Sequence, residues 1–210
     1  MKLVVLTNDV LKEELLAQGL PANAQVEWIT DPAYFSQHID ADAFFDLLFI
    51  NEPARIHLLN NKPSIPVIIN YVTGMLQELP SQFIRINAWV TFLKRPYVEA
   101  AGKDEMIKDK AAAIFSSFGK TTNWVPDIPG FISARVVSAI INEAYYSLEE
   151  EISTKEDIDI AMKTGTNYPY GPFEWGDKIG LENILALLSE LNKEHPRYQP
   201  APGLIKEAIH

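Results

Sequence analysis

The stretch DIPGFISARVVSAIINEAYYSLEEEISTKEDIDIAMKTGTNYPYGPFEWGDKIGL, residues 127–181, carries the clearest helix start, turn and stop signals of the chain. Asp127 lies two residues before Pro129, which is favoured in the first turn of a helix, so a helix is predicted to begin there. Apolar residues then recur at helical spacing: Ile132, Val136, Ala139, Ile140, Ala144, Leu148 and Ile152. Val137, Ile141 and Tyr145 widen this stripe beyond a single core face. Such width is typical of a helix covered on two sides, either as the centre of a helical bundle or as a dimer seam.

The sequence beyond this first helix also carries helix signals. Ser153–Glu156 has the pattern of a capping box and opens a predicted helix that Gly165 terminates. Two more apolar helices are predicted at Glu182–Asn192 and Leu204–Ile209. Residues 127–210 are therefore predicted to form an all-α second domain.

Residues 1–126 alternate short apolar runs with helical patterns. The runs are rich in β-branched and aromatic residues, as expected of buried strands: Lys2–Thr7, Ala24–Thr30, Ala43–Asn51, Ile65–Asn70, Phe83–Val90 and Thr121–Val125. Before the last of them, Lys103–Phe118 has apolar residues at helical spacing and is followed by Gly119, a helix stop. Strands that alternate with helices and begin with a buried strand predict an α/β doubly wound sheet. This first domain is predicted to end at Pro126.

The loop after the first strand bears on cofactor binding. A dinucleotide site on such a sheet needs the pattern G-x-G-x-x-G there, so that the backbone can approach the pyrophosphate. Here the loop is Thr7–Lys12, no glycine occurs before Gly19, and Asp9 would repel a phosphate. Asp31 stands after the second strand, where an acid could bind a ribose hydroxyl of NAD, although an Asp-Pro pair is also a common turn former. The loop therefore disfavours NAD binding in the usual manner.

Composition and charge argue against several functional classes. The chain has no cysteine, and its four histidines lie far apart without metal-ligand spacing, so no metal site is expected. The net charge of −10 disfavours nucleic-acid binding, which needs a basic face, but is compatible with a small anionic ligand held by a few local cations. The opening MKLVVLTNDV has too short an apolar run for a signal peptide or a membrane span. A cytoplasmic protein without a membrane contact is expected.

Residues from 129 onward resemble the C-terminal domain of the 3-hydroxyacyl-CoA dehydrogenase family. The matching positions are Pro129–Ile132, Arg135, Asn142–Ala144, Glu156–Asp159, Ala161–Lys163, Gly165, Pro169, Gly171–Glu174, Asp177, Gly180–Leu181 and Arg197–Pro202, with Tyr97–Glu99 and Phe118–Lys120 upstream. The resemblance implies an α/β Rossmann-like N-terminal domain and an all-α C-terminal domain, like that of 6-phosphogluconate dehydrogenase, which mediates homodimerisation. It also implies NAD as the cofactor, an acyl-CoA substrate and a place in fatty acid metabolism.

The resemblance also assigns roles to single positions in the first domain. In this family, a histidine in a His-Phe-Phe-Asn-Pro segment takes the proton of the 3-hydroxyl group, and a glutamate twelve residues later orients it. Glu99 stands at the position of the glutamate, and Asn87 stands at that of the histidine. Histidine titrates near neutral pH, whereas an asparagine amide accepts no proton there. The orienting acid is present and the base is replaced.

Two substrate-binding positions of the family are also altered. The asparagine of its Pro-Gly-Phe-Ile-x-Asn-Arg motif falls at Ala134. Its Asn-Thr-Ser-Ser segment corresponds to residues 70–73, which leaves Asn70 and Thr73 as candidate substrate contacts. His38 and His57 could replace the missing base, but a surface position is more typical of such histidines.

Three hypotheses for the function follow. In the first, the protein is a pseudoenzyme: a catalytically degenerate homodimer that could still hold an acyl-CoA or a related ligand. In the second, it is an active NAD-dependent 3-hydroxyacyl-CoA oxidoreductase with a remodelled site. In the third, it is a non-enzymatic module that binds a partner protein. The substituted base and the missing glycines favour the first hypothesis.

Overall fold

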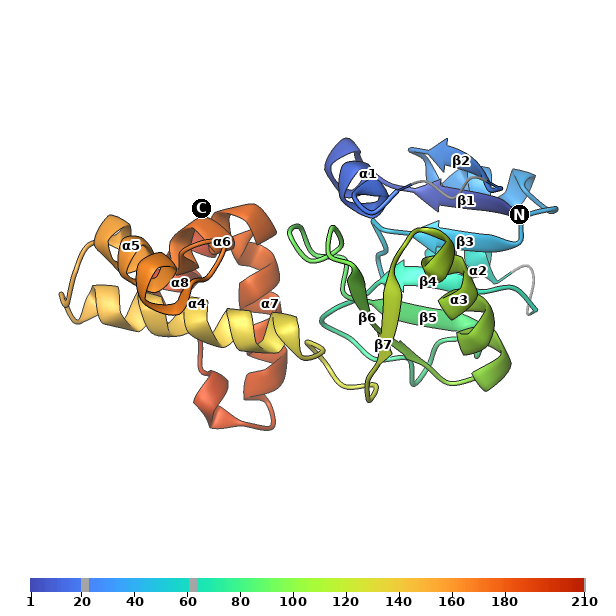
Figure 1. Ribbon diagram of the computed structural model, residues 1–210. Coiled ribbons are helices and arrows are strands. Elements are labelled where there is room, and N and C mark those ends of the chain that lie inside the picture. Colours follow the sequence, from blue (N-terminus) through green and yellow to red (C-terminus); the bar gives the residue numbers. More distant parts are fainter. Residues whose placement is uncertain (20–22, 61–63, 210) are drawn as a thin grey trace. The chain divides into compact units, whose positions relative to one another are not determined.

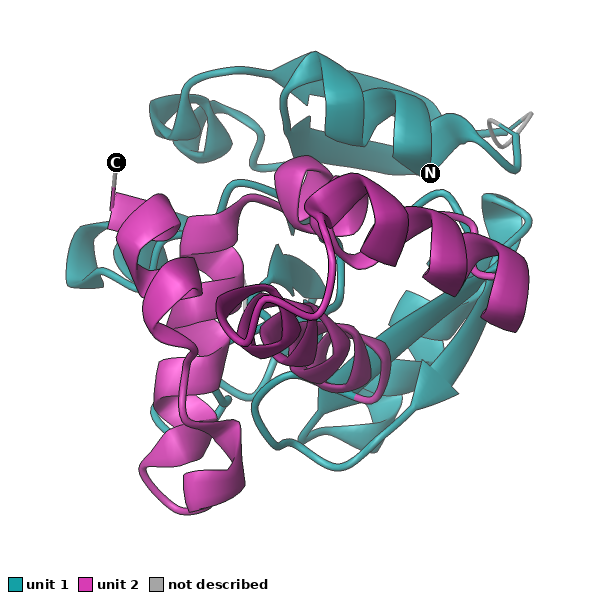
Figure 2. Cartoon of the chain, turned by 90° about the vertical axis from the view of Figure 1, so that its left-hand side faces the viewer, with its two compact units in different colours: residues 1–131 teal, residues 132–210 magenta. Residues whose placement is uncertain are grey.

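A computed structural model describes residues 1–19, 23–60 and 64–209. The chain divides into two compact units, Met1–Phe131 and residues 132–210, drawn in teal and magenta (Figure 2). Residues 127–131, which the sequence assigns to the second domain, belong to the first unit. Over the described ranges, no helix combines the length and the hydrophobicity that crossing a bilayer requires.

The first unit is built on one sheet, whose described strands follow the order β2-β1-β3-β4-β5-β6-β7 (Figure 1). The strands are β1 (Lys2–Leu6), β2 (Gln25–Ile29), β3 (Ala43–Asp46), β4 (Val67–Asn70), β5 (Phe83–Ile86), β6 (Tyr97–Gly102) and β7 (Thr121–Trp124). Neighbouring strands are parallel except for β5 and β6, which are antiparallel. The predicted α/β sheet is therefore confirmed, with one reversed strand.

Helices cover both faces of this sheet. They are α1 (Asp9–Leu16), η1 (Pro32–Gln37), α2 (Pro53–Leu59) and α3 (Glu105–Ser117). Phe44 and Phe45 show the two faces, since successive residues of a strand point to opposite sides. Phe45 packs edge-to-face on Phe115 of α3, and Phe44 packs in the same way on Phe35 of η1. Burial on both faces explains why the central strands are almost wholly apolar.

The strand predictions differ from the structure in one main respect. The sequence places no strand between Phe83–Val90 and Thr121–Val125, whereas β6 lies there and joins β5 to β7. Its second half is Ala100, Ala101 and Gly102, which have little β propensity, so its extended form depends on pairing on both sides. The strand predicted at Ala43–Asn51 ends at Asp46, whose side chain accepts a hydrogen bond from the backbone N–H of Leu48 (3.1 Å) and turns the chain.

The second unit is all-α, as predicted. Its helices are α4 (Ser133–Glu149), α5 (Lys155–Thr166), α6 (Pro172–Ile179), α7 (Leu181–Asn192), η2 (Pro196–Tyr198) and α8 (Pro202–Ile209). The prediction that a helix begins at Asp127 is wrong, because Gly130 and Phe131 have left-handed φ angles of 85° and 50° that no helix contains. The predicted stop at Gly165 is also wrong: α5 continues to Thr166, and Asn167 provides the left-handed C-cap.

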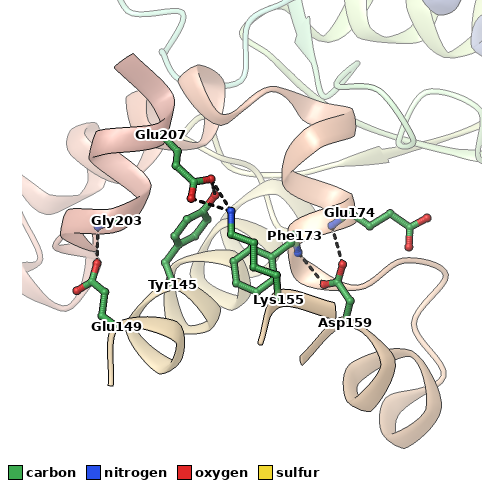
Figure 3. A network of polar contacts seen from close by, with 8 residues as sticks. All are labelled: Tyr145, Glu149, Lys155, Asp159, Phe173, Glu174, Gly203 and Glu207. Carbon is green, nitrogen blue, oxygen red and sulfur yellow. Dashed lines mark hydrogen bonds and ion pairs between the residues drawn. The ribbon is translucent and has the colours of Figure 1, made fainter. Parts of the chain in front are cut away.

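Polar contacts tie the helices of this unit together (Figure 3). Glu207 of α8 accepts hydrogen bonds from Tyr145 of α4 (2.8 Å) and from Lys155 of α5 (2.6 Å). Asp159 of α5 caps the start of α6 by accepting from the backbone N–H groups of residues 173 and 174, at 2.8 and 3.0 Å. These bonds fix α5, α6 and α8 around α4 and give the second unit its own framework.

Candidate functional site

The carboxyl ends of the parallel strands form one edge of the sheet, where ligands of such folds bind. Asn70 is the last residue of β4, and Asn87 follows β5 directly. Glu99 belongs to β6, which runs in the opposite direction. The antiparallel register pairs Ile86 with Ala100, so the next pair along the ladder is Asn87 and Glu99. The sheet therefore brings Asn87 and Glu99, which are twelve residues apart, into contact at this edge.

Asn87 and Glu99 form a side-chain pair. The Nδ2 of Asn87 donates a hydrogen bond to the Oε2 of Glu99 at 3.0 Å, and the backbone N–H of Asn87 donates to the carbonyl of Glu99 at 3.1 Å. The other side-chain atom of Asn87, Oδ1, accepts from the backbone N–H of Trp89 at 3.4 Å. Asn87 is buried and Glu99 is half-buried. The amide thus holds the carboxylate in place but offers no group that titrates near neutral pH.

Asn70 joins three strand ends. Its Nδ2 donates to the carbonyl of Leu47, just after β3 (3.2 Å), and its Oδ1 accepts from the backbone N–H of Ala88, just after β5 (3.1 Å). This bridge places the side chain of Asn70 beside the residue that follows Asn87. Thr73, the other candidate in this segment, is half-buried three residues beyond β4.

The remaining predicted positions lie elsewhere. Ala134 is fully buried in α4 of the second unit. Asp31 is exposed at the start of η1 and caps it by accepting from the backbone N–H of Ala33 at 2.8 Å. Its carboxylate therefore has a structural role as the N-cap of η1.

The residues after β1 do not fit a dinucleotide bound in the usual manner. The first helix N-terminus of such a fold holds the pyrophosphate on free backbone N–H groups. In this chain, the Oδ1 of Asn8 already accepts from the backbone N–H of Leu11 at 2.9 Å, and Asp9 adds a negative charge in the first turn of α1. The hydroxyl of Thr7 donates to the carbonyl of Asn8 at 3.0 Å. A side chain thus already uses one of the N–H donors that a pyrophosphate would need, and a second side chain brings a like charge.

A buried ion pair lies at the same strand edge and was not singled out from the sequence. Asp46, the last residue of β3, is fully buried, and its Oδ2 lies 3.1 Å from a guanidinium nitrogen of Arg55 on α2. Burial raises the pKa of Asp46 from 3.8 to about 6, against the opposing effects of Arg55 and of the Leu48 N–H group. The signal for it was a single acid at the end of the apolar run AFFD.

Two buried charged side chains, Glu14 and Lys120, hold the turn after β5 through bonds to its backbone. Glu14 of α1 accepts from the backbone N–H groups of Thr91 (2.6 Å) and Lys94 (3.3 Å). The ammonium group of Lys120 donates to the carbonyl groups of residues 93 and 95, at 2.5 and 3.0 Å. Burial lowers the pKa of Lys120 to about 8, and the nearby Glu14 opposes this shift. Among the described residues, no three histidine, aspartate or glutamate side chains are grouped as metal ligands would be.

Comparison with known proteins identifies relatives of the chain. Residues 130–209 match the family described as 3-hydroxyacyl-CoA dehydrogenase, C-terminal domain. A 3-hydroxyadipyl-CoA dehydrogenase of Escherichia coli is 38% identical over 112 residues, which are 52% of this chain and 24% of the relative. A probable 3-hydroxybutyryl-CoA dehydrogenase of Bacillus subtilis is 34% identical over 157 residues, which are 73% of this chain and 54% of the relative. The chain thus spans about a quarter of the first relative and about half of the second.

Solved structures of similar fold point the same way. The (S)-3-hydroxybutyryl-CoA dehydrogenase PaaH1 of Ralstonia eutropha superposes with a TM-score of 0.76 at 19% identity, over 99% of this chain and 93% of that one. The FadB2 protein of Mycobacterium tuberculosis gives a TM-score of 0.77 at 17% identity, with the same coverage. The fold is therefore a Rossmann-like sheet domain followed by a helical domain. With the matching sequence in the helical unit, this places the chain in the 3-hydroxyacyl-CoA dehydrogenase family.

Proposed function

We propose that this protein is a catalytically inactive member of its family that binds an acyl-CoA or a related anionic ligand without oxidising or reducing it. The observation that carries the proposal is the pair of Asn87 and Glu99, in which an amide donates to the carboxylate at 3.0 Å. General base catalysis needs a group that accepts and returns a proton near the working pH, and histidine does so. The Asn87 amide keeps the hydrogen bond to the glutamate that a histidine would make. It cannot transfer a proton as a histidine would.

Neighbouring groups support this proposal. The oxygen of the Asn87 amide accepts from Trp89, and both polar atoms of the Asn70 side chain are bonded to the backbone. These bonds hold the strand ends in fixed positions. The self-capped start of α1 supports the loss of NAD binding in the usual manner. An acyl-CoA is the proposed ligand because the names of the E. coli, B. subtilis and R. eutropha relatives refer to CoA thioesters.

Ligand binding is tested by the thermal stability of the purified protein. A ligand present at a hundred times its dissociation constant stabilises the folded state by about 2.7 kcal/mol. Acetoacetyl-CoA is expected to raise the melting temperature, and NADH at millimolar concentration is expected to leave it unchanged. A rise with NADH would support an active oxidoreductase with a remodelled site instead. No rise with acetoacetyl-CoA, CoA or NADH would contradict the ligand-binding proposal and favour a partner-binding module.

We also propose that the protein is a homodimer that associates through α4 and α5. Helix α5 has an apolar side but no buried residue. Val136 of α4 is 51% exposed and Ile160 of α5 is 56% exposed. Between the two helices runs a shallow groove of about 190 Å³, with a largely apolar lining: Ile140, Glu143, Ala144, Ser147, Ile158, Met162 and Pro172. An apolar helix surface of this kind favours a second copy of the same surface as its partner.

The mass of the protein in solution tests the dimer. Val136→Glu introduces a charge on the α4 surface and is expected to convert a dimer into a monomer in analytical ultracentrifugation. Ile209→Glu is the matched control, since Ile209 is 70% exposed on α8, outside the proposed interface. A monomeric wild-type protein, or an equal effect of the two variants, would contradict this interface. A cytoplasmic location remains a prediction.

A further inference from the structure

Strand β5 carries a charged residue in the middle of an apolar sequence, Phe-Ile-Arg-Ile. Its neighbours Ile84 and Ile86 belong to the core cluster on the side of α3. Arg85 therefore points to the opposite face of the sheet, because successive strand residues alternate. The side chain of Arg85 is nevertheless completely buried. An arginine is seldom buried so fully unless its charge and its donors are matched.

The guanidinium group of Arg85 binds two separate segments. In the first segment, which follows β4, the guanidinium group donates to the carbonyl of Gly74. In the second segment, which precedes α4, it donates to Asp127 at 3.0 Å and to the carbonyl of Ile128 at 2.8 Å. The ring of Phe131 covers it, with a distance of 4.1 Å from the guanidinium carbon to the ring centroid. One side chain thus contacts both segments at once.

Two further bonds join these segments directly. The second oxygen of Asp127, Oδ2, accepts from the backbone N–H of Leu76 at 2.8 Å. The backbone N–H of Gly130 donates to the carbonyl of Val72 at 2.8 Å. Neither segment belongs to a helix or a strand, since β4 ends at Asn70 and α4 begins at Ser133. No regular hydrogen-bond ladder orders them: the bonds of Arg85 and Asp127 join them to each other, and Lys103, which donates to the carbonyl of Leu76 at 2.9 Å, holds the first segment as well.

The energetics make this arrangement cooperative. Burial lowers the pKa of Arg85 to about 10, and Asp127 opposes the shift, so the guanidinium group remains charged at neutral pH. A buried charge that loses its counter-ion is strongly unfavourable, whereas the intact pair is tolerated. Release of residues 127–131 would leave Arg85 without its counter-ion and would also free the N–H group of Leu76. Neither segment can then leave without weakening the other.

We propose that the Arg85–Asp127 pair couples residues 72–76 to residues 127–131, so that the two segments open and close as one unit. Residues 72–76 include the candidate ligand contact Thr73, and residues 127–131 lead into α4. Through this pair, a displacement of residues 72–76 would also displace residues 127–131, which connect the two compact units. This inference holds whether or not the chain binds an acyl-CoA.

Amide hydrogen exchange of the full chain, followed by mass spectrometry, tests the coupling. In Asp127→Asn, exchange is expected to rise by at least about tenfold in peptides from both segments, because the variant loses the charged partner of Arg85. A tenfold rise corresponds to a fall of about 1.4 kcal/mol in the free energy of local opening. Peptides of β1 should keep the wild-type rate. Arg55→Gln is the matched control: it breaks the buried pair with Asp46 on the same sheet and should leave both segments unchanged.

Arg85→Lys provides a second variant if Asp127→Asn does not fold. Lysine keeps the charge but cannot reproduce the planar fork that bonds Gly74, Asp127 and Ile128 together. Faster exchange in both segments, at equal factors, would support the coupling. Faster exchange in only one segment, no change in either, or a uniform rise that includes β1 would overturn it.

Discussion

Raising the pH from about 4 to about 7 is expected to weaken the fold through one carboxyl group, that of Asp46. The group lies at the end of β3, completely buried, with Arg55 and the N–H group of Leu48 as its partners at 3.1 Å. Burial is the largest effect on it and raises its pKa from 3.8 to about 6, more than Arg55 and the hydrogen bond lower it. The folded state therefore keeps a proton on Asp46 over a range in which the unfolded chain releases it.

The sign and size of the effect follow from proton linkage. Between pH 3.8 and about 6 the folded state binds more protons than the unfolded state, so the free energy of unfolding falls as the pH rises. The stabilisation is complete below the unfolded pKa and is lost as the pH rises through the folded pKa. One pKa unit corresponds to about 1.4 kcal/mol, so the whole shift is worth about 3 kcal/mol, of which about 2 kcal/mol falls between pH 4 and pH 7.

Urea unfolding of the wild type and of Asp46→Asn at several pH values measures this contribution. The other titrating groups are common to both proteins, so the difference between their free energies of unfolding isolates Asp46. Relative to the variant, the wild type is expected to lose about 2 kcal/mol between pH 4 and pH 7. A difference that is independent of pH, or one that grows in favour of the wild type as the pH rises, would refute the reasoning. The second result would mean that the ion pair with Arg55 outweighs burial.

Two pairs of substitutions test local packing by urea unfolding. In Gly171→Ala, the new methyl group would lie 2.2 Å from the carboxyl carbon of Asp159, so the cap of α6 must move, and a loss of about 0.5–2 kcal/mol is expected. In Gly165→Ala, no atom lies within 4 Å of the new group, and a gain of up to about 1 kcal/mol is expected; equal effects at the two glycines would contradict the cap. Glu14→Ala removes the acceptor of the buried N–H group of Thr91 and of the part-buried N–H group of Lys94, and should cost about 1–3 kcal/mol. Glu13→Ala, on the exposed side of the same helix, should cost much less, and a similar loss would count against the buried role of Glu14.

The alternation of apolar runs and helical patterns was enough to predict the sheet, because its central strands are buried on both faces and their sequences are continuously apolar. It failed for β6, where Ala100, Ala101 and Gly102 have no strand preference of their own and take their extended form from two neighbouring strands. It also failed at Asp127–Pro129, where the signals of a helix start precede the left-handed residues Gly130 and Phe131. Both errors concern conformations that long-range contacts decide.

In the candidate site, too, one pair of residues could be predicted from the sequence and another could not. The spacing of twelve residues between Asn87 and Glu99 has a structural origin, since the reversed strand β6 brings them together in the register of the sheet. Family resemblance could locate that pair. The partner of Arg85, by contrast, is 42 residues away and in an irregular segment, so no periodicity or motif could reveal it. Pairs of this kind depend on the assembled fold.

The proposed lack of activity rests on the amide of Asn87, which cannot act as a base beside Glu99. The most direct measurement is the oxidation of NADH by the purified wild-type protein in the presence of acetoacetyl-CoA, with Glu99→Ala as the control. The wild type and the control are both expected to show only the rate seen without protein. Turnover by the wild type that disappears in Glu99→Ala would contradict this expectation, because Glu99 would then be serving a working active site.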